Sequence, residues 1–222
     1  MDIISISDTH DQHIDMQIES GEILIHAGDI SSLGQKNRVI DFLDWFADLP
    51  HKHKIFIAGN HDLSFDENKN FGTKPDWLID ILSNIPDNIH YLENESIELE
   101  GINFFGSPIT PWFYGDRWAF NKHRGDEIKE VWNKIPLDTD VLITHGPPFG
   151  VFDYAKFSRI HVGCEGLVDA IERIKPILHI FGHIHEGFGI VEKNGTTFIN
   201  ASQLDENYNY VNNSIKTQWT KK

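Results

Sequence analysis

The chain has 222 residues, 40% of them hydrophobic, which suits one domain with a full apolar core. Its 34 acidic and 19 basic residues give a formal net charge of −15, which argues against binding to duplex nucleic acid. No stretch approaches the roughly 20 apolar residues of a membrane helix, so no membrane partner is expected.

We expect a single domain over residues 1–222, located in the cytoplasm. An apolar run begins two residues after Met1 and leaves no room for a cleavable signal peptide. Cys164 is the single cysteine, so no internal disulfide can form, in keeping with a reducing compartment. Cys164 precedes a predicted helix, where a small packing thiol is the simplest interpretation.

Five short apolar runs have the length and boundaries of buried strands. In chain order they cover residues 3–7, 23–27, 55–58, 141–143 and 177–181. They lead into Asp8-Thr9-His10, Gly28-Asp29, Gly59-Asn60-His61-Asp62, Thr144-His145-Gly146 and Gly182-His183-Ile184-His185. Because open α/β sheets bind ligands outside the carboxyl ends of their strands, these polar side chains are expected to gather at one place.

Four segments between or after these runs carry apolar residues at helical spacing. They are residues 37–49, 76–84, 126–134 and 166–175, and prolines follow the first, third and fourth of them. Helices that alternate with strands indicate an α/β protein of stacked layers.

Further strands are predicted outside this alternation. Residues 90–92 and 96–99 lead through Glu100-Gly101 into residues 102–105, and Asn194-Gly195 joins residues 189–192 to 196–200 in a second hairpin. The polar segment 204–222 is expected either to supply an edge strand at 214–219 or to fray.

The polar residues that follow the strands form a set of seven metal-ligand types. They are the carboxylates of Asp8 and Asp29, the amide of Asn60, and the imidazoles of His10, His145, His183 and His185. A mixed nitrogen and oxygen set without thiolates suits Mn, Fe, Zn or Co better than Ca. Seven ligands are too many for one compact ion and suit two, and paired ions can clamp a phosphoryl group and acidify a bridging water.

The ordered set of motifs resembles the calcineurin-like metallophosphoesterase superfamily. The resemblance is closer to the branch of metallophosphoesterase-domain-containing proteins, which is similar to class III cyclic-nucleotide phosphodiesterases. This branch is indicated by Phe105-Gly106-Ser107-Pro108, Pro111-Trp112-Phe113, Trp118-Ala119-Phe120-Asn121, Thr144-His145-Gly146-Pro147-Pro148, His185-Glu186-Gly187-Phe188-Gly189 and Ile199-Asn200-Ala201-Ser202.

The resemblance implies a four-layer α/β/β/α sandwich of two mixed sheets flanked by helices. It also implies the site roles: one metal held by Asp8, His10 and His185, a second held by Asn60, His145 and His183, and Asp29 as the bridge. His61 would be a general acid or a hydrogen-bond donor to phosphate, with Asp62 fixing or charging its imidazole. Some animal members of the branch carry Gly in place of His183, which weakens their second site; this chain keeps the histidine, so a competent catalyst is expected.

Other residues remain open to two interpretations. Trp112, Phe113, Trp118 and Phe120 could form a substrate-stacking shelf, with Asn121 beside it, or could belong to the core. His26 and His179 lie inside strands, so a hydrogen-bonded core role is expected.

The sequence thus predicts a phosphoesterase that uses two divalent ions. Mn is the first choice, with Fe, Zn, Co, Mg or Ni as alternatives. The resemblance to the branch implies hydrolysis of small phosphodiesters, such as cyclic nucleotides, through a metal-bridging hydroxide. The alternatives are a nucleotide-binding regulatory protein with little turnover, a phosphomonoesterase or a nuclease.

Overall fold

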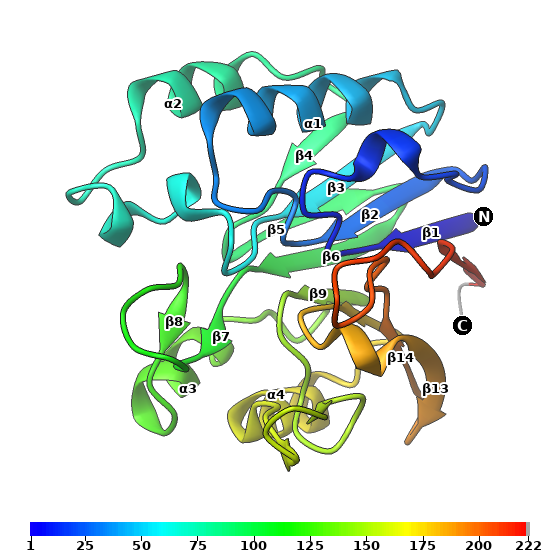
Figure 1. Cartoon of the computed structure of the whole chain (residues 1–222). Coiled ribbons are helices and arrows are strands. Elements are labelled where there is room, and N and C mark those ends of the chain that lie inside the picture. Colours follow the sequence, from blue (N-terminus) through cyan, green and yellow to red (C-terminus); the bar gives the residue numbers. More distant parts are fainter. Residues whose placement is uncertain (221–222) are drawn as a thin grey trace.

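Two mixed β-sheets form the centre of residues 1–220, the part of the chain that the computed structural model describes (Figure 1). The first sheet has the strand order β15-β1-β2-β3-β4. Its four parallel strands are β1 (Asp2–Ile6), β2 (Ile23–Ala27), β3 (His53–Ile57) and β4 (Ile89–Tyr91). The antiparallel edge strand β15 (Ile215–Gln218) confirms the predicted strand near the carboxyl terminus. Lys221 and Lys222, the end of the predicted polar segment, lie outside the described residues.

The second sheet has the order β13-β14-β12-β9-β6-β5. Its parallel centre consists of β6 (Ile102–Ser107), β9 (Val141–Thr144), β12 (Leu178–Phe181) and β14 (Thr196–Asn200). The edge strands β5 (Glu95–Leu99) and β13 (Gly189–Lys193) pair antiparallel, each through a predicted hairpin. Both turns have two residues in the left-handed region, as a type I′ turn requires: Glu100-Gly101 and Asn194-Gly195.

Helices cover the outer face of each sheet (Figure 1). The first sheet carries α1 (Lys36–Asp48) and α2 (Asp76–Ser83), and the second carries α3 (Asp126–Trp132) and α4 (Glu165–Ile174). Between the sheets lies a separate apolar core, in which Ile25 and Ile55 of one sheet meet Phe104 and Ile180 of the other. This arrangement confirms the predicted four-layer fold, and each predicted helix agrees with the observed one to within two residues.

One predicted grouping of strands is wrong. Residues 90–92 and the strands that follow were expected to lie outside the main alternation. Instead β4 is the fourth parallel strand of the first sheet, and β6 pairs with β9 in the parallel centre of the second sheet. The neighbours of a strand within its sheet depend on contacts between residues far apart in the chain, which the local periodicity of the sequence does not reveal.

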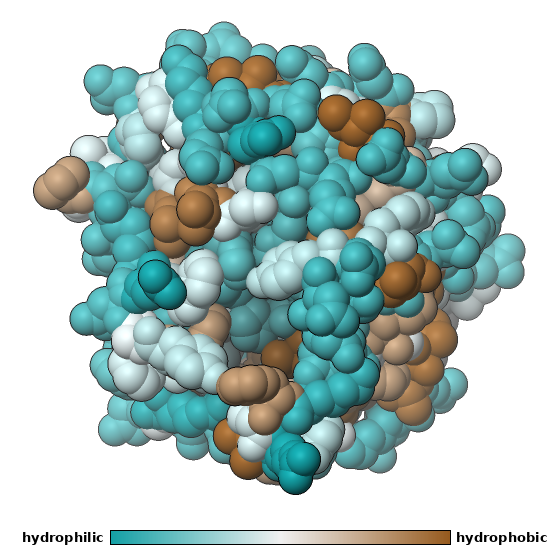
Figure 2. All heavy atoms as spheres, viewed as in Figure 1, coloured by the Kyte–Doolittle hydropathy of each residue, from teal (hydrophilic) through white to brown (hydrophobic). Residues whose placement is uncertain are grey.

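Short elements complete the fold. They are the parallel pair β7 (Thr110–Pro111) and β8 (Asn121–Lys122), the hairpin β10 (Tyr154–Ala155) and β11 (Ile160–His161), and single 3₁₀ turns at His13–Asp15, Leu63–Phe65, Glu67–Lys69 and His185–Gly187. Over residues 1–220, no helix combines the length and the apolar character needed to cross a bilayer. Figure 2 shows a mainly hydrophilic face with small, separate hydrophobic patches.

Three predictions about buried side chains are confirmed. Cys164 is buried and its sulfur accepts a hydrogen bond from Trp132 Nε1 at 3.3 Å, as expected for a packing thiol. His26 Nε2 lies 3.0 Å from the hydroxyl of Thr9, and His179 Nε2 lies 2.8 Å from that of Thr144. Thr9 and Thr144 each adjoin a predicted metal ligand, so the two core histidines brace the loops of the site.

Buried His179 should make the protein sensitive to acid. Burial lowers the pKa of His179 to about 3, below its ordinary value of 6.5, and its Nδ1 has no hydrogen-bond partner. As the pH falls below 6.5, the unfolded chain takes up a proton that the folded chain refuses, so stability present above pH 6.5 is lost. This loss is about 1.4 kcal/mol per pH unit for one such proton.

Urea unfolding of the chelated protein between pH 8 and pH 5 tests this effect. His179→Gln should be less stable than wild type at pH 8 but should show a shallower loss towards pH 5. The exposed His123→Gln variant is the control and should parallel the wild type. Parallel curves for His179→Gln and wild type would contradict the prediction.

Candidate metal centre

The carboxyl ends of the central strands bring the predicted ligands together. Asp8 follows β1, Asp29 follows β2 and Asn60 lies beyond β3, while His145 follows β9 and His183 lies beyond β12. A parallel bridge between Ser7 and Ser202 joins the two sheets at this edge. The loops therefore face one another, and residues from position 8 to position 185 share one site.

The loops turn sharply where the ligands stand. Asp8, His10, Asp29 and His183 all have positive φ, between 40° and 67°. Such a cluster of left-handed non-glycine residues is costly and typical of functional sites. Close approach also explains Gly59, because a Cβ there would collide with the Asp29 carboxylate.

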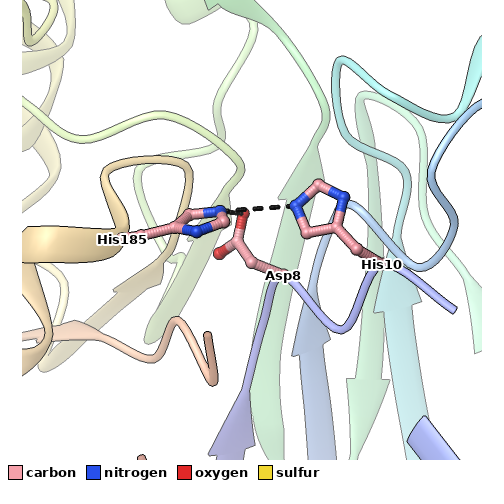
Figure 3. Close-up of side chains that lie close together, drawn as sticks. All are labelled: Asp8, His10 and His185. Carbon is pink, nitrogen blue, oxygen red and sulfur yellow. Dashed lines mark hydrogen bonds and ion pairs between the residues drawn. The ribbon is translucent and has the colours of Figure 1, made fainter. Parts of the chain in front are cut away.

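Asp8, His10 and His185 form the first ligand group (Figure 3). The Nε2 atoms of His10 and His185 lie 3.3 Å apart, and His185 Nε2 lies 3.5 Å from an Asp8 oxygen. In Figure 3 the two imidazoles point at one another across the Asp8 carboxylate. Two imidazole nitrogens that converge with a carboxylate form a donor set that fits a divalent cation.

Asp29, His145 and His183 form a second group that shares no residue with the first. His145 Nε2 lies 3.3 Å from Asp29 Oδ2 and 2.9 Å from Asn60 Oδ1. Asp29 Oδ2 also lies 3.6 Å from His10 Nε2, so its carboxylate stands between the two groups.

Backbone carbonyls orient two of the histidines. His145 Nδ1 donates to the carbonyl of Ala27 and His185 Nδ1 to that of Asp205, both at 2.9 Å. With the proton on Nδ1, the neutral ring directs the lone pair of Nε2 into the site, as metal-binding histidines require. Asp8 is held as well: it accepts the Ser202 hydroxyl at 2.7 Å and the His183 amide at 3.0 Å.

Charges inside the centre are balanced by protons when no metal is bound. Burial opposes the protonation of His145 and His185, but Asp29 and Asp8 outweigh it and raise both pKa values to about 9. Burial lowers the pKa of His10 to about 4 and that of His183 to about 3. Cations must displace the protons of His145 and His185, so metal affinity should fall as the pH is lowered.

His61 lies at the edge of the same centre. Its Nδ1 is 2.8 Å from the carbonyl of Ser32, and its backbone amide donates to Asp29 at 2.8 Å. The ring packs edge-on against His10 and lies 4.2 Å from the ring of Trp118. A ring nitrogen of His61 lies close to ligand atoms of both His10 and Asp29. The His61 ring can therefore reach a molecule that is bound between the first and the second ligand group.

The expectation that Asp62 fixes or charges His61 is wrong. The carboxylate of Asp62 accepts the backbone amides of Ile30, Ser31 and Gly59 and the Ser31 hydroxyl, at 2.7–3.1 Å. The Ser32 carbonyl, not Asp62, orients the imidazole. Burial and the charge of Asp29 raise the pKa of Asp62 to about 7, which also weakens any role as a fixed charge.

Asp62 should therefore matter for stability. Asp62→Ala leaves three buried amides without an acceptor, each of which costs about 1–3 kcal/mol, so the free energy of unfolding should fall by about 3–9 kcal/mol. Asp62→Asn keeps an acceptor oxygen and should lose about half as much. Urea unfolding of both variants and of wild type checks this order; equal stability of all three would contradict the role.

A cavity of about 570 Å³ opens beside His183 and His185. Trp112 and Phe113 line it, as the predicted substrate shelf requires, and Phe113 lies 5.1 Å from the ring of His183. Trp118 packs on His61 instead.

Two members of the predicted shelf face elsewhere. Phe120 is buried in the core, and the side-chain oxygen of Asn121 accepts the Thr110 hydroxyl at 2.9 Å. Asn121 does not line the cavity, and its substrate contact stays a prediction. Its backbone pairs with Thr110 of β7.

Sequence reasoning missed the far wall of this cavity. Phe157, which is 93% exposed, and Ile160 come from the β10–β11 hairpin, and Tyr208 comes from the carboxyl-terminal segment. The Tyr208 ring lies 4.9 Å from His10 and 5.3 Å from His185. Exposed aromatic residues in polar loops were the available signal, but only the tertiary structure places them here.

Comparisons with known proteins agree with this geometry. A family model described as calcineurin-like phosphoesterase matches residues 1–187. Human metallophosphoesterase domain-containing protein 1 is 40% identical, over 96% of this chain and 69% of the relative. A UPF0046 protein of Caenorhabditis elegans is 38% identical, over 92% of this chain and 70% of the relative. TT1561 of Thermus thermophilus has a similar fold, with a TM-score of 0.58 at 12% identity over 90% of this chain and 88% of that one.

Proposed function

Because this chain belongs to the calcineurin-like phosphoesterase family and is a metal-dependent phosphoester hydrolase, we propose that it hydrolyses small phosphodiesters at a centre of two divalent ions. The observation that carries the proposal is the pair of ligand groups with Asp29 between them. In this assignment one ion is held by Asp8, His10 and His185, the other by Asn60, His145 and His183, and Asp29 serves both. When bound, such ions supply Lewis acidity towards a phosphoryl oxygen and acidify water.

The side chains of the site divide the remaining work. His61 is held by the Ser32 carbonyl through Nδ1, so its Nε2 can face the substrate and, when the ring is doubly protonated, give a proton to the leaving oxygen. The cavity beside His183 and His185 receives the organic part of the substrate against Trp112 and Phe113. Aromatic faces of this kind suit a nucleobase.

Charge in the cavity favours a diester over a monoester. Among residues 1–220, Arg124 is the single lysine or arginine that lines it. Its guanidinium already donates to the carbonyls of Val162 and Gly163 and pairs with Glu165. Glu186 and Glu206 also line the cavity. A singly charged phosphodiester is therefore better tolerated than a doubly charged monoester.

The test is hydrolysis by Mn-loaded protein of four substrates: 2′,3′-cyclic AMP, 3′,5′-cyclic AMP, bis-p-nitrophenyl phosphate and p-nitrophenyl phosphate. We expect turnover of diesters with kcat/KM at least tenfold above that of the monoester, and two metal ions per chain by elemental analysis. Tight nucleotide binding with one ion per chain and no turnover would favour a regulatory protein. Absence of turnover with every divalent metal tried would refute the proposal.

A further inference from the structure

A second cavity, of about 460 Å³, lies away from the metal centre. It is enclosed by α4, by the loop at Pro148–Val151 and by the hairpin that joins β13 to β14. It shares no lining residue with the cavity beside His183. None of the seven predicted metal ligands contributes to it, so the phosphoesterase reaction leaves it without a role.

The inner surface of this cavity is mainly apolar. Val151, Ile171 and Phe198 form its floor and are almost fully buried, with 5–8% of their surface exposed. Phe149 lines it too, with 44% of its surface exposed at the rim. The volume falls in the range of sites that hold small organic molecules.

Two lysines also line the cavity, brought together from separate elements. Lys175 follows the last turn of α4 with a φ of 55°, and Lys193 ends β13. A cation at a helix carboxyl terminus is favourable in itself, which accounts for Lys175 but not for Lys193. Neither lysine has a carboxylate partner among the ion pairs of residues 1–220. The two lysines place two positive charges beside one apolar cavity, in a chain with 34 acidic and 19 basic residues.

We propose that this cavity binds a small amphipathic anion, with an apolar body on the floor of Val151, Ile171 and Phe198 and one carboxylate, sulfonate or phosphate group at Lys175 and Lys193. An acidic residue, Glu172, lines the cavity as well, and its negative charge disfavours a ligand that carries several negative charges. A neutral molecule of the same shape gains the apolar contact alone, and a cationic one is repelled by both lysines.

Three probes that share the same phenylbutyl group separate the contribution of apolar contact from that of charge. They are 4-phenylbutyrate, 4-phenyl-1-butanol and 4-phenylbutylamine. Isothermal titration of the Mn-loaded protein should give one site per chain for the carboxylate, with an affinity at least about tenfold above that of the alcohol, and no binding of the amine. Because the cavity holds no metal ligand, carboxylate binding should persist after chelation. Equal affinity for all three probes, or loss of carboxylate binding on chelation, would overturn the proposal.

Variants test the location. Lys175→Gln combined with Lys193→Gln should weaken phenylbutyrate binding at least about tenfold and leave the affinity for the alcohol unchanged. A matched control, Lys36→Gln combined with Lys134→Gln, removes the same charge elsewhere and should leave both affinities unchanged. Val168→Trp, from the half-buried face of α4, should fill the cavity and abolish binding of both probes. Unchanged phenylbutyrate affinity in the variant that combines Lys175→Gln with Lys193→Gln would overturn the proposal, even if Val168→Trp failed to fold.

Discussion

Replacing Asp29 by asparagine should lower kcat/KM for bis-p-nitrophenyl phosphate by at least about a thousandfold. The carboxylate stands between His10 and His145, at 3.6 and 3.3 Å from their Nε2 atoms, and it forms possible metal-binding groups with each of these histidines. Asparagine keeps the shape of the side chain but removes its negative charge, and it replaces one acceptor oxygen by an NH₂ group that only donates. Such a centre should lose at least one of its ions.

The measurements for Asp29→Asn are steady-state kinetics with Mn in excess and metal content after gel filtration. Wild type should retain two ions per chain and the variant one or none, with the far-ultraviolet circular dichroism unchanged. Asp169→Asn, an exposed carboxylate on α4 that pairs with Lys129, is the matched control and should behave as wild type. Full activity with two ions in the Asp29 variant would end the assignment of Asp29 as the shared ligand.

Replacing His61 by asparagine should reduce kcat by about 100- to 1,000-fold while the protein keeps its metal ions. Asparagine can still donate to the Ser32 carbonyl, so the loop is retained, but no group then reaches the leaving oxygen. If His61 donates a proton, the loss should depend on the leaving group. It should be large for 2′,3′-cyclic AMP, whose alkoxide needs a proton, and smaller for bis-p-nitrophenyl phosphate.

The leaving group gives an independent reading of His61. The ratio of kcat for 2′,3′-cyclic AMP to kcat for bis-p-nitrophenyl phosphate should fall in His61→Asn, because only the alkoxide leaving group needs a proton donor. His90→Asn, at β4 and outside the metal centre, is the control. An equal loss of kcat for both substrates would contradict the general-acid role and would favour hydrogen bonding to phosphate as the role of His61.

The hydrogen-bond partners of the side chains in the site were harder to predict from the sequence than the positions of those side chains. Asp62 adjoins His61 in the chain, which favoured a pair between them, but its carboxylate accepts the backbone amides of Ile30, Ser31 and Gly59 instead. Asn121 lies near the aromatic segment, yet it pairs with Thr110 across two short strands. Adjacent residues can point in opposite directions, and loop contacts decide the direction.

The sequence by itself determined which side chains gather at the candidate metal centre and that the fold is layered. Each ligand stands just after an apolar strand, and parallel strands carry their ends to one edge, so a local pattern repeated along the chain was sufficient. Only the tertiary structure decided what surrounds the ligands: Ser202 on Asp8, the Asp205 carbonyl on His185, and Tyr208 and Phe157 on the cavity wall. These residues lie in loops whose paths depend on long-range packing, which leaves no periodic trace in the chain.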